Sequence, residues 1–227
     1  MKCPICNSEK LTDLVYHQGV FQCQECQHLF RQDANTFDYN FYSQHDYWYN
    51  DPHWRRFMRT YFAFFDDFIM PHSPTIEFGA ANGDFLSVVN EEVPISIIYY
   101  NELVDLVNPK YDCIIPKENR FIGSIEEISL PSMFVDNVFL IEVLEHCKSP
   151  YKVFSVLQKI TRIGGRVCIA TDNAEHLNAP DMIFRHREHL HIFSERSFRQ
   201  LLTSYPFKIL LYWNSPVGKS YIVLEKT

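Results

Sequence analysis

The sequence predicts an α/β protein in which helices cover both faces of a mostly parallel sheet, with a small cysteine-rich module in front of it. From Pro74 onward, short apolar segments alternate with amphipathic ones, as strands and helices do in such a sheet. The first 34 residues instead contain four of the seven cysteines, in two Cys-x-x-Cys pairs. The chain of 227 residues is long enough for one substantial domain and a small appendage.

The two cysteine pairs are separated by sixteen residues, a spacing that suits a short hairpin between two metal-binding knuckles. We expect a structural Zn²⁺ with four thiolate ligands, which leaves no coordination position for catalysis. The expected ligands are Cys3, Cys6, Cys23 and Cys26. Two disulfides are the alternative. The other cysteines follow no pairing pattern and no signal peptide precedes Cys3, so we expect a reduced, cytoplasmic protein.

Aromatic side chains dominate the segment that follows. Between Trp54 and Phe68 they recur at helical spacing, which predicts a helix that packs its aromatic face on the next domain. A substrate lid is the alternative reading. Residues 39–53 show no periodicity, and we expect an irregular aromatic loop there. The chain is therefore divided into a zinc ribbon at 1–34, an aromatic-rich helical linker or lid at 35–73, and an α/β domain at 74–227.

The α/β part is predicted element by element from apolar runs, turn residues and helix caps. Strands are expected at 75–79, 95–100, 120–123, 135–141, 166–171, 208–213 and 220–225, and helices at 84–92, at 150–160 and after Ser194. Residues 103–120 contain two prolines, and we expect a broken helix there. Gly164-Gly165 is expected to turn the chain into the fifth strand.

The loop after the first of these strands is the candidate ligand site, because ligands bind at the carboxyl ends of strands in open sheets. It carries Gly79 and Gly83, whose backbones can approach a ligand, while Ala81 occupies the second glycine position. An ordinary strand-to-helix turn would look the same. Glu102, at the end of the next strand, stands where a carboxylate binds ribose in nucleotide sites.

Three blocks make residues 54–227 resemble a class I S-adenosylmethionine-dependent methyltransferase. They are Glu77-Phe-Gly-Ala-Ala-Asn-Gly83, Val135 to His146 with Glu-Val-Leu-Glu-His at its end, and Ile163 to Asn173 with its Gly-Gly pair. With the cysteine module in front, the chain is similar to zinc-ribbon methyltransferases of the sugar and polysaccharide modification type. The resemblance implies a Rossmann-like, seven-stranded mixed sheet with helices on both faces.

The same resemblance implies a cofactor site for S-adenosylmethionine. Near the methionine part it would place four residues of the loop: Glu77, Gly79, Ala81 and Gly83. Glu102 would accept hydrogen bonds from the ribose, Ser124 and Ile125 would flank the adenine, and Glu142 would close the pocket. Two residues depart from the family pattern, since Ala81 replaces a usual glycine and Ser124 stands where Asp is common.

Transfer to a hydroxyl would require a general base with a pKa near neutrality, which makes histidine the obvious side chain. The candidates are His146, His189 and His191, each of which could instead be structural. We prefer His189 and His191, because they precede the helix whose loop should overhang the substrate.

A metal-assisted mechanism is an alternative. Glu142, Glu145 and His146 have the i, i+3, i+4 spacing of one helical turn. This resembles the divalent-metal ligands of ubiquinone-pathway O-methyltransferases and of small-RNA terminal 2′-O-methyltransferases, in which a downstream histidine also binds, as the run Arg185 to His189 would allow. Mg²⁺ or Mn²⁺ could polarise an acceptor hydroxyl. The net charge of −7 argues against an RNA-binding face.

We therefore expect a cytoplasmic S-adenosylmethionine-dependent methyltransferase that methylates a small metabolite or nucleotide-linked sugar, on oxygen. Its partner is a small-molecule acceptor, and we expect no nucleic acid and no membrane. No apolar run approaches the length of a membrane span. The alternatives are a binding or scaffold protein on a methyltransferase fold, and a metal-assisted RNA 2′-O-methyltransferase.

Overall fold

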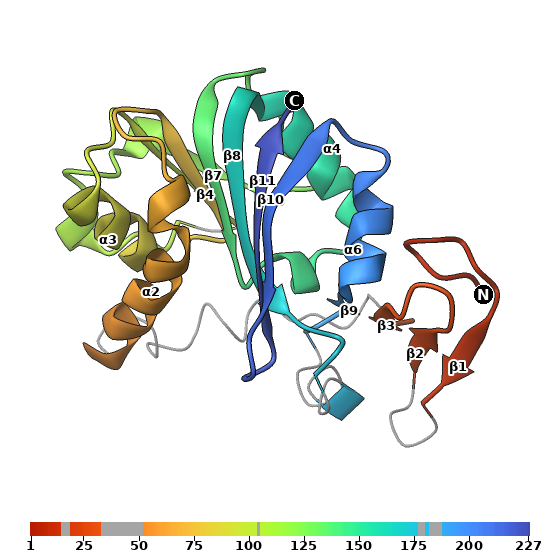
Figure 1. The fold of residues 1–227 in the computed structure, drawn as a ribbon. Coiled ribbons are helices and arrows are strands. Elements are labelled where there is room, and N and C mark those ends of the chain that lie inside the picture. The colour runs from red at the N-terminus through yellow and green to blue at the C-terminus, as the bar shows by residue number, and fades with distance from the viewer. Residues whose placement is uncertain (15–18, 33–51, 104, 177–179, 182–187) are drawn as a thin grey trace.

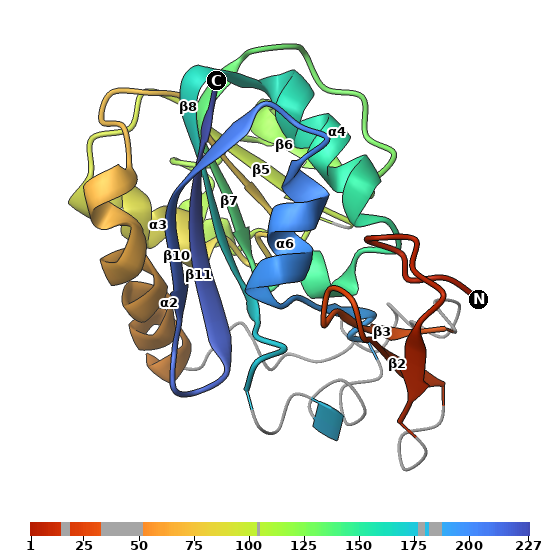
Figure 2. The ribbon, with the colours of Figure 1, turned by 45° about the vertical axis from the view of Figure 1, so that its right-hand side comes forward.

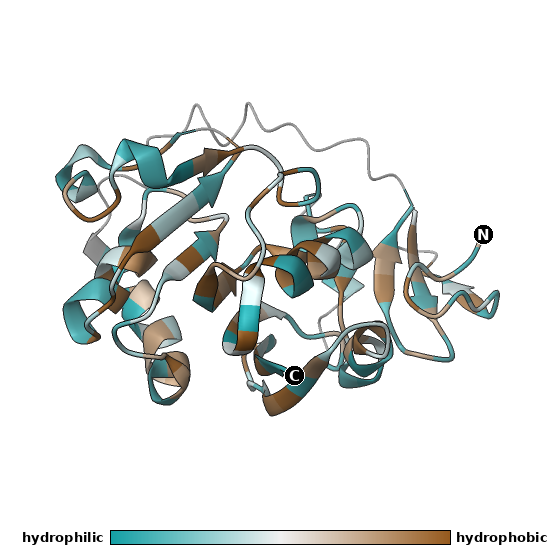
Figure 3. Ribbon diagram, turned by 90° about the horizontal axis from the view of Figure 1, so that it is seen from above, coloured by the Kyte–Doolittle hydropathy of each residue, from teal (hydrophilic) through white to brown (hydrophobic). Residues whose placement is uncertain are grey.

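A large sheet with helices on both faces forms the main body of the protein, and a smaller sheet containing the N-terminus lies at one end of it (Figures 1 and 3). The computed structural model describes residues 1–14, 19–32, 52–103, 105–176, 180–181 and 188–227. Most of the predicted aromatic loop, residues 39–51, and the basic run Arg185 to Arg187 lie outside these residues. No helix in the described part of the chain is long and apolar enough to cross a membrane.

The large sheet has seven strands in the order β10-β11-β8-β7-β4-β5-β6. Their bounds are β4 (Thr75–Phe78), β5 (Ile98–Glu102), β6 (Arg120–Ile122), β7 (Val135–Ile141), β8 (Thr161–Asp172), β10 (Phe207–Asn214) and β11 (Lys219–Lys226). The five strands from β4 to β8 pair in parallel, whereas β11 runs antiparallel to both β8 and β10. This confirms the predicted α/β fold with a seven-stranded mixed sheet. The chain order reverses at β4, which has β5 on one side and β7 on the other.

Two layers of helices cover the sheet (Figure 2). On one face lie α2 (Pro52–Phe65) and α3 (Asp84–Glu92), and on the other lie α4 (Pro150–Ile160) and α6 (Glu195–Leu202). The strands between them are apolar on both faces: β7 reads Val-Asp-Asn-Val-Phe-Leu-Ile, and most of its residues are fully buried. The α6 helix begins with a capping box in which Ser194 and Ser197 bond each other's backbone amides.

The aromatic helix of the linker is present as α2, followed by the short turn η2 (Asp66–Phe68). Tyr61 and Phe65 are fully buried against Phe139 and Tyr221 of the sheet, so the predicted packing of the aromatic face is confirmed. Phe57 lies at the edge of that face and is 43% exposed.

Two local predictions were wrong. Residues 103–120 contain two single 3₁₀ turns, η3 (Pro109–Tyr111) and η4 (Lys117–Asn119), because proline suits the start of a turn and interrupts a longer helix. The Gly164-Gly165 pair does not precede the fifth strand but lies within β8, at an irregularity in its pairing with β7.

The small sheet joins the N-terminal strands to the segment just before α6. Its order is β1-β2-β3-β9, with β1 (Leu11–Asp13), β2 (Val20–Cys23), β3 (Leu29–Arg31) and β9 (His191–Ile192). We call these four strands the N-terminal sheet, although β9 comes from the segment just before α6. The three-domain division of the chain stays a prediction.

Beyond β4 the backbone passes very close to the end of β7. Gly79 adopts a left-handed φ of +64°, and a Cβ atom there would lie 2.4 Å from Cγ2 of Val143. Glycine is therefore required at this position both by backbone conformation and by space.

We expect Gly79→Ala to lower the free energy of unfolding by about 2–4 kcal/mol, because an L-residue is strained at this φ and its Cβ overpacks the contact with Val143. Gly164→Ala is the matched control: its φ is +80°, but no atom lies within 4 Å of the added Cβ, so only about 1 kcal/mol is expected. Chemical denaturation measures both, and equal losses would contradict the close approach.

Candidate functional site

The loop between β4 and α3 is held by hydrogen bonds to β5. The amide of Ala80 donates to the carbonyl of Asn101 at 3.1 Å, and the Tyr100 hydroxyl donates to the carbonyl of Ala81 at 2.7 Å. Ala81 has a φ of +44°, a conformation that glycine adopts at lower cost. Gly83, with φ +86°, is the N-cap of α3. The loop thus keeps the shape of a glycine-rich turn although its second glycine position is an alanine.

Glu102, at the end of β5, points back to this loop. Its carboxylate accepts hydrogen bonds from the amides of Leu103, at 2.8 Å, and of Ala81, at 3.2 Å. Burial raises the pKa of Glu102, and these two amides oppose the rise. A carboxylate has about four lone-pair positions, so it can still accept from two hydroxyl groups.

A cavity of about 50 Å³ lies between the loop and α2. It is lined by Trp54, Met58, Glu77, Gly79, Ala80, Ala81, Asn82, Asp84, Phe85, Ile141 and Glu142. A nucleotide-sized ligand needs about 300 Å³ or more, so the lining side chains must move apart to admit one. Of the predicted cofactor residues, Gly83, Glu102, Ser124 and Ile125 are not among those that line it.

Glu77 brings an incompletely bonded carboxylate to this cavity. Its Oε2 is buried and has no hydrogen-bond partner among the described residues. Burial raises the pKa of Glu77 well above its ordinary value, and the nearby charges of Glu102 and Asp84 add to the effect. A cationic donor placed in the cavity would satisfy this oxygen.

The predicted adenine contacts lie farther along the sheet edge. Ser124 follows β6 and accepts a hydrogen bond from the amide of Glu126 at 3.2 Å. Ile125 is buried in the core cluster that also contains Leu130 and Val135. Their contact with a cofactor stays a prediction.

A chain of charged contacts runs from the cavity along the ends of the strands. Glu142, at the end of β7, accepts a hydrogen bond from the Tyr61 hydroxyl at 3.0 Å and pairs with Lys219. Lys219 Nζ also lies 2.6 Å from Oδ1 of Asp172, and the other carboxylate oxygen of Asp172 lies 2.7 Å from Nδ1 of His189. Five side chains from five different segments therefore form one connected network.

The pKa values in this network follow from burial and mutual charge. Burial, together with the charge of Glu145, raises the pKa of Glu142 to about 7, although Lys219 opposes the rise. Burial also disfavours the charge of Asp172, but the adjacent His189 imidazole and the Lys219 ammonium outweigh it and lower its pKa to about 2. Burial acts against protonation of His189, yet the close contact with the Asp172 carboxylate leaves its pKa raised.

A second cluster lies beside this network. The ligand atoms of Glu145, His146 and His189 all lie within 4.8 Å of one another. Glu145 is fully buried; its Oε2 accepts from the Thr171 hydroxyl at 2.8 Å, while Oε1 has no hydrogen-bond partner in the described part of the chain. Nδ1 of His146 donates to the carbonyl of Glu188 at 3.2 Å. When Nδ1 of a histidine donates, Nε2 carries the lone pair.

The helical turn that was predicted to begin at Glu142 begins later. It is the 3₁₀ turn η5 (Leu144–His146), and Glu142 itself has a φ of +56°, outside any helix. Glu142 therefore does not belong to the described cluster of Glu145 and His146, whose third member is His189.

The structure separates the three candidate histidines. His189 contacts Asp172 and packs edge-on against His146, with ring centroids 4.8 Å apart. His191 instead lies in strand β9 of the N-terminal sheet, where its Nδ1 is 3.0 Å from Nε2 of His28. Burial lowers the pKa of His191 to about 4 and that of His146 also to about 4. The placement of His191 favours a structural role.

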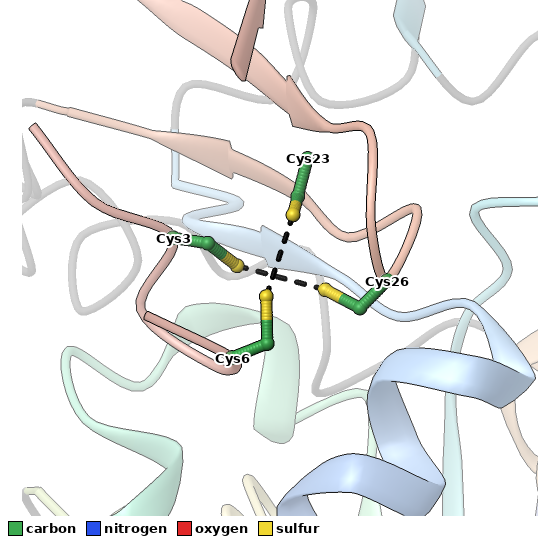
Figure 4. Close-up of side chains that lie close together, drawn as sticks. All are labelled: Cys3, Cys6, Cys23 and Cys26. Carbon is green, nitrogen blue, oxygen red and sulfur yellow. Dashed lines mark hydrogen bonds between the residues drawn. The ribbon is translucent and has the colours of Figure 1, made fainter. Parts of the chain in front are cut away.

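The four N-terminal cysteines converge (Figure 4). The sulfurs of Cys3 and Cys26 are 3.6 Å apart, those of Cys6 and Cys23 are 3.4 Å apart, and all four lie within 4.8 Å of one another. Tetrahedral coordination at Zn–S distances of about 2.3 Å would place sulfurs about 3.8 Å apart. We call these residues the cysteine cluster.

Both knuckles of the cysteine cluster have the same backbone geometry. The amide of Asn7 donates to the carbonyl of Cys3 at 3.0 Å, and the amide of Gln27 donates to that of Cys23 at 2.9 Å. Asn7 and Gln27 have φ of +59° and +61°, respectively. The donor set and the paired knuckles fit a tetrahedral Zn²⁺.

Sequence reasoning missed Lys219 and Asp172, and it treated Tyr61 only as a packing residue. Asp172 is the last residue of an apolar strand, and this position could have identified it as a candidate site residue. Lys219 follows the turn at Gly218 in an antiparallel strand, whose first residue lies at the same sheet edge as the ends of the parallel strands. Only the direction of β11 would have revealed it.

The sequence and the fold of this chain are similar to those of known proteins. Residues 39–212 match the model of a family described as methyltransferase domain. No curated protein matches the chain.

Two solved structures illustrate the likeness. The PH0226 protein from Pyrococcus horikoshii OT3 has a TM-score of 0.67 at 10% identity, covering 84% of this chain and 100% of that one. Geranyl diphosphate C-methyltransferase from Streptomyces coelicolor A3(2), in complex with Mg²⁺, geranyl diphosphate and S-adenosyl-L-homocysteine, has a TM-score of 0.59 at 11% identity, covering 77% of this chain and 78% of that one. At such identities the likeness concerns the fold alone.

We expect the unmodified chain to bind about one zinc ion per molecule, and Cys23→Ser to lose this zinc and to unfold at a lower temperature, because metal binding stabilises the folded knuckles. Cys113→Ser is the control, since Cys113 is exposed and lies outside the cysteine cluster. Elemental analysis and thermal unfolding test both variants, and full zinc retention by Cys23→Ser would rule out the four-cysteine site.

Proposed function

This chain belongs to the methyltransferase domain family, and from that premise we propose that it methylates a hydroxyl group of a small metabolite or nucleotide-linked sugar. Methyl transfer from S-adenosylmethionine follows from the family, whereas the acceptor and the methylated atom are the proposal. The observation that carries it is the contact of 2.7 Å between Asp172 and His189, which Lys219 links to Glu142 in the lining of the cavity.

The residues of the loop are suited to the cofactor. S-adenosylmethionine, when bound, supplies an electrophilic methyl group on a sulfonium. The buried, incompletely bonded Glu77 suits the ammonium of its methionine part, with Gly79, Ala81 and Gly83 around it. Glu102 would accept from the ribose hydroxyls.

The remaining cofactor contacts rest on the family pattern. Ser124 and Ile125 would flank the adenine. Glu142 would close the pocket, since it lines the cavity and is held there by Tyr61 and Lys219.

His189 is the proposed general base. With Nδ1 held by Asp172, Nε2 is the nitrogen that can take the proton of an acceptor hydroxyl as its oxygen bonds to the methyl carbon. The Asp172 carboxylate then stabilises the imidazolium, as its low pKa of about 2 keeps it ionised at neutral pH. His146 is the second candidate, but its lowered pKa makes it the weaker base.

A small acceptor is supported by the charge of the chain and by its fold. A net charge of −7 and the neighbouring carboxylates of Glu142, Glu145 and Asp172 are unfavourable for a nucleic-acid backbone. The Streptomyces neighbour acts on a small molecule, geranyl diphosphate. The sugar class rests on the similarity of the cysteine module to that of sugar-modifying methyltransferases.

Metal-assisted transfer is the second candidate, and one observation favours it. The unbonded Oε1 of Glu145 lies in a cluster with His146 and His189. Nδ1 of His146 donates to a backbone carbonyl, as in many metal-binding histidines, and Nδ1 of His189 lies 2.7 Å from the Asp172 carboxylate. Glu145, His146 and His189 would hold Mg²⁺ or Mn²⁺, and the ion would polarise the acceptor oxygen.

The cofactor assignment is tested by calorimetric titration with S-adenosylmethionine and S-adenosylhomocysteine. We expect micromolar dissociation constants, corresponding to about −8 kcal/mol. Glu102→Gln should weaken binding about tenfold or more by removing charge-assisted hydrogen bonds to the ribose. Glu118→Gln, at an exposed turn, should bind normally. No binding by folded, zinc-loaded protein would instead support a scaffold role.

Manganese titration separates the two mechanisms. If the metal candidate is correct, zinc-loaded protein saturated with S-adenosylhomocysteine should bind Mn²⁺, as followed by electron paramagnetic resonance, and Glu145→Gln should abolish that binding. Glu118→Gln is the control, because Glu118 is exposed and lies outside the described metal cluster. Absence of Mn²⁺ binding to the unmodified chain would leave His189 as base without a metal.

A further inference from the structure

We propose that the N-terminal sheet positions His189, so that the cysteine cluster is a structural part of the active site and not an independent appendage. The inference rests on the proposed role of His189 as base. It makes His28 and Ser194 positioning residues, which act on His189 through strand β9.

The segment that contains His189 is bonded on both sides. The amide of Leu190 donates to the carbonyl of Glu145 at 2.7 Å, which ties the segment to the turn of the active site. The carbonyl of the same Leu190 accepts from the amide of Arg31 at 2.9 Å, which ties it to strand β3. One residue beyond His189 thus connects the methyltransferase sheet edge with the N-terminal sheet.

The register of this connection is set by a buried polar pair. Strand β9 pairs antiparallel with β3, with Phe30 opposite His191. Beneath the pairing, His28 is fully buried, its Nε2 lies 3.0 Å from Nδ1 of His191, and its ring packs on Phe193 at 4.8 Å. Any slip of β9 would separate the two imidazoles in an apolar environment, which is costly for both.

The cysteine cluster is bonded directly to the same segment. The Ser194 hydroxyl donates to the carbonyl of Cys26 at 2.6 Å and accepts from the amide of Ser197, so it links the second knuckle to the start of α6. From the first knuckle, the carbonyl of Ile5 accepts from the Tyr151 hydroxyl of α4 at 2.7 Å. Both knuckles are therefore anchored on helices of the methyltransferase domain.

The consequence for His189 is geometric. A shift of β9 by one residue moves the chain by about 3.3 Å. That displacement exceeds the 2.7 Å separation of His189 and Asp172 and would break their contact. The base can keep its partner only while the N-terminal sheet holds β9 in place.

Nuclear magnetic resonance of ¹⁵N-histidine-labelled, zinc-loaded protein tests the inference without an acceptor substrate. We expect a downfield Nδ1–H resonance for the histidine bonded to Asp172, identified by its loss in His189→Gln. His28→Leu should lose this resonance, and amide hydrogen exchange should become faster at Leu190. Affinity for S-adenosylhomocysteine should be unchanged, because no backbone hydrogen bond in the described part of the chain links the loop after β4 to β9.

Ser194→Ala provides the second variant in case His28→Leu does not fold. It removes the bond to Cys26, while its control Ser197→Ala perturbs the same capping box and keeps that bond. The resonance should be lost in Ser194→Ala and retained in Ser197→Ala. The inference is overturned if the resonance is retained in folded His28→Leu or in Ser194→Ala. It is also overturned if the unmodified chain shows no such resonance. If the unmodified chain does not bind S-adenosylhomocysteine, the proposed function is refuted, independently of the inference about β9.

Discussion

The site depends on the two ion pairs of Lys219. Its ammonium lies between two carboxylates that would otherwise repel each other. It pairs with Glu142 on one side and with Asp172 on the other, and Asp172 is fully buried. Taking these charges out of water is costly, and a buried ion pair of this kind seldom stabilises a fold by itself. The cost is consistent with a functional reason for keeping them, since the network runs from the cavity at Glu142 to His189.

Strand direction makes this interaction possible. The parallel strands bring Glu142 and Asp172 to one edge of the sheet at their carboxyl ends, and the antiparallel β11 brings its first residue to the same edge. Lys219 stands directly opposite Asp172 in the register of β8 and β11. With Glu145 as a third acid, carboxylates outnumber the lysine, so this edge favours positive charge, including the charge that His189 would gain on taking a proton.

The second constraint is the contact between the N-terminal strands and the segment before α6. Strand β9 belongs by position to the methyltransferase sequence and by pairing to the N-terminal sheet. The residues on either side of it are bonded to the turn at Glu145, through Leu190, and to the knuckle at Cys26, through Ser194. This arrangement explains why two neighbouring histidines differ so much: His189 faces a carboxylate at the sheet edge, whereas His191 is buried against another imidazole.

The sequence by itself determined the features that depend on local spacing. The Cys-x-x-Cys pairs, the apolar run of β7, the aromatic period of α2 and the loop from Glu77 to Phe85 are each encoded within a few residues, and the alternation of strands and helices predicted a mostly parallel sheet. The sequence also marked Ala81 as standing at a glycine position, and the structure shows the left-handed backbone that glycine adopts more easily there.

The tertiary structure alone decided which side chains meet. Lys219 and Asp172 are 47 residues apart in sequence, and His28 and His191 are 163 apart. Such contacts arise from strand order, direction and register, which the hydrophobic pattern of a single segment does not specify. The same reason excluded Glu142 from the cluster of Glu145 and His146, since the turn between them is 3₁₀ and begins after a residue with positive φ.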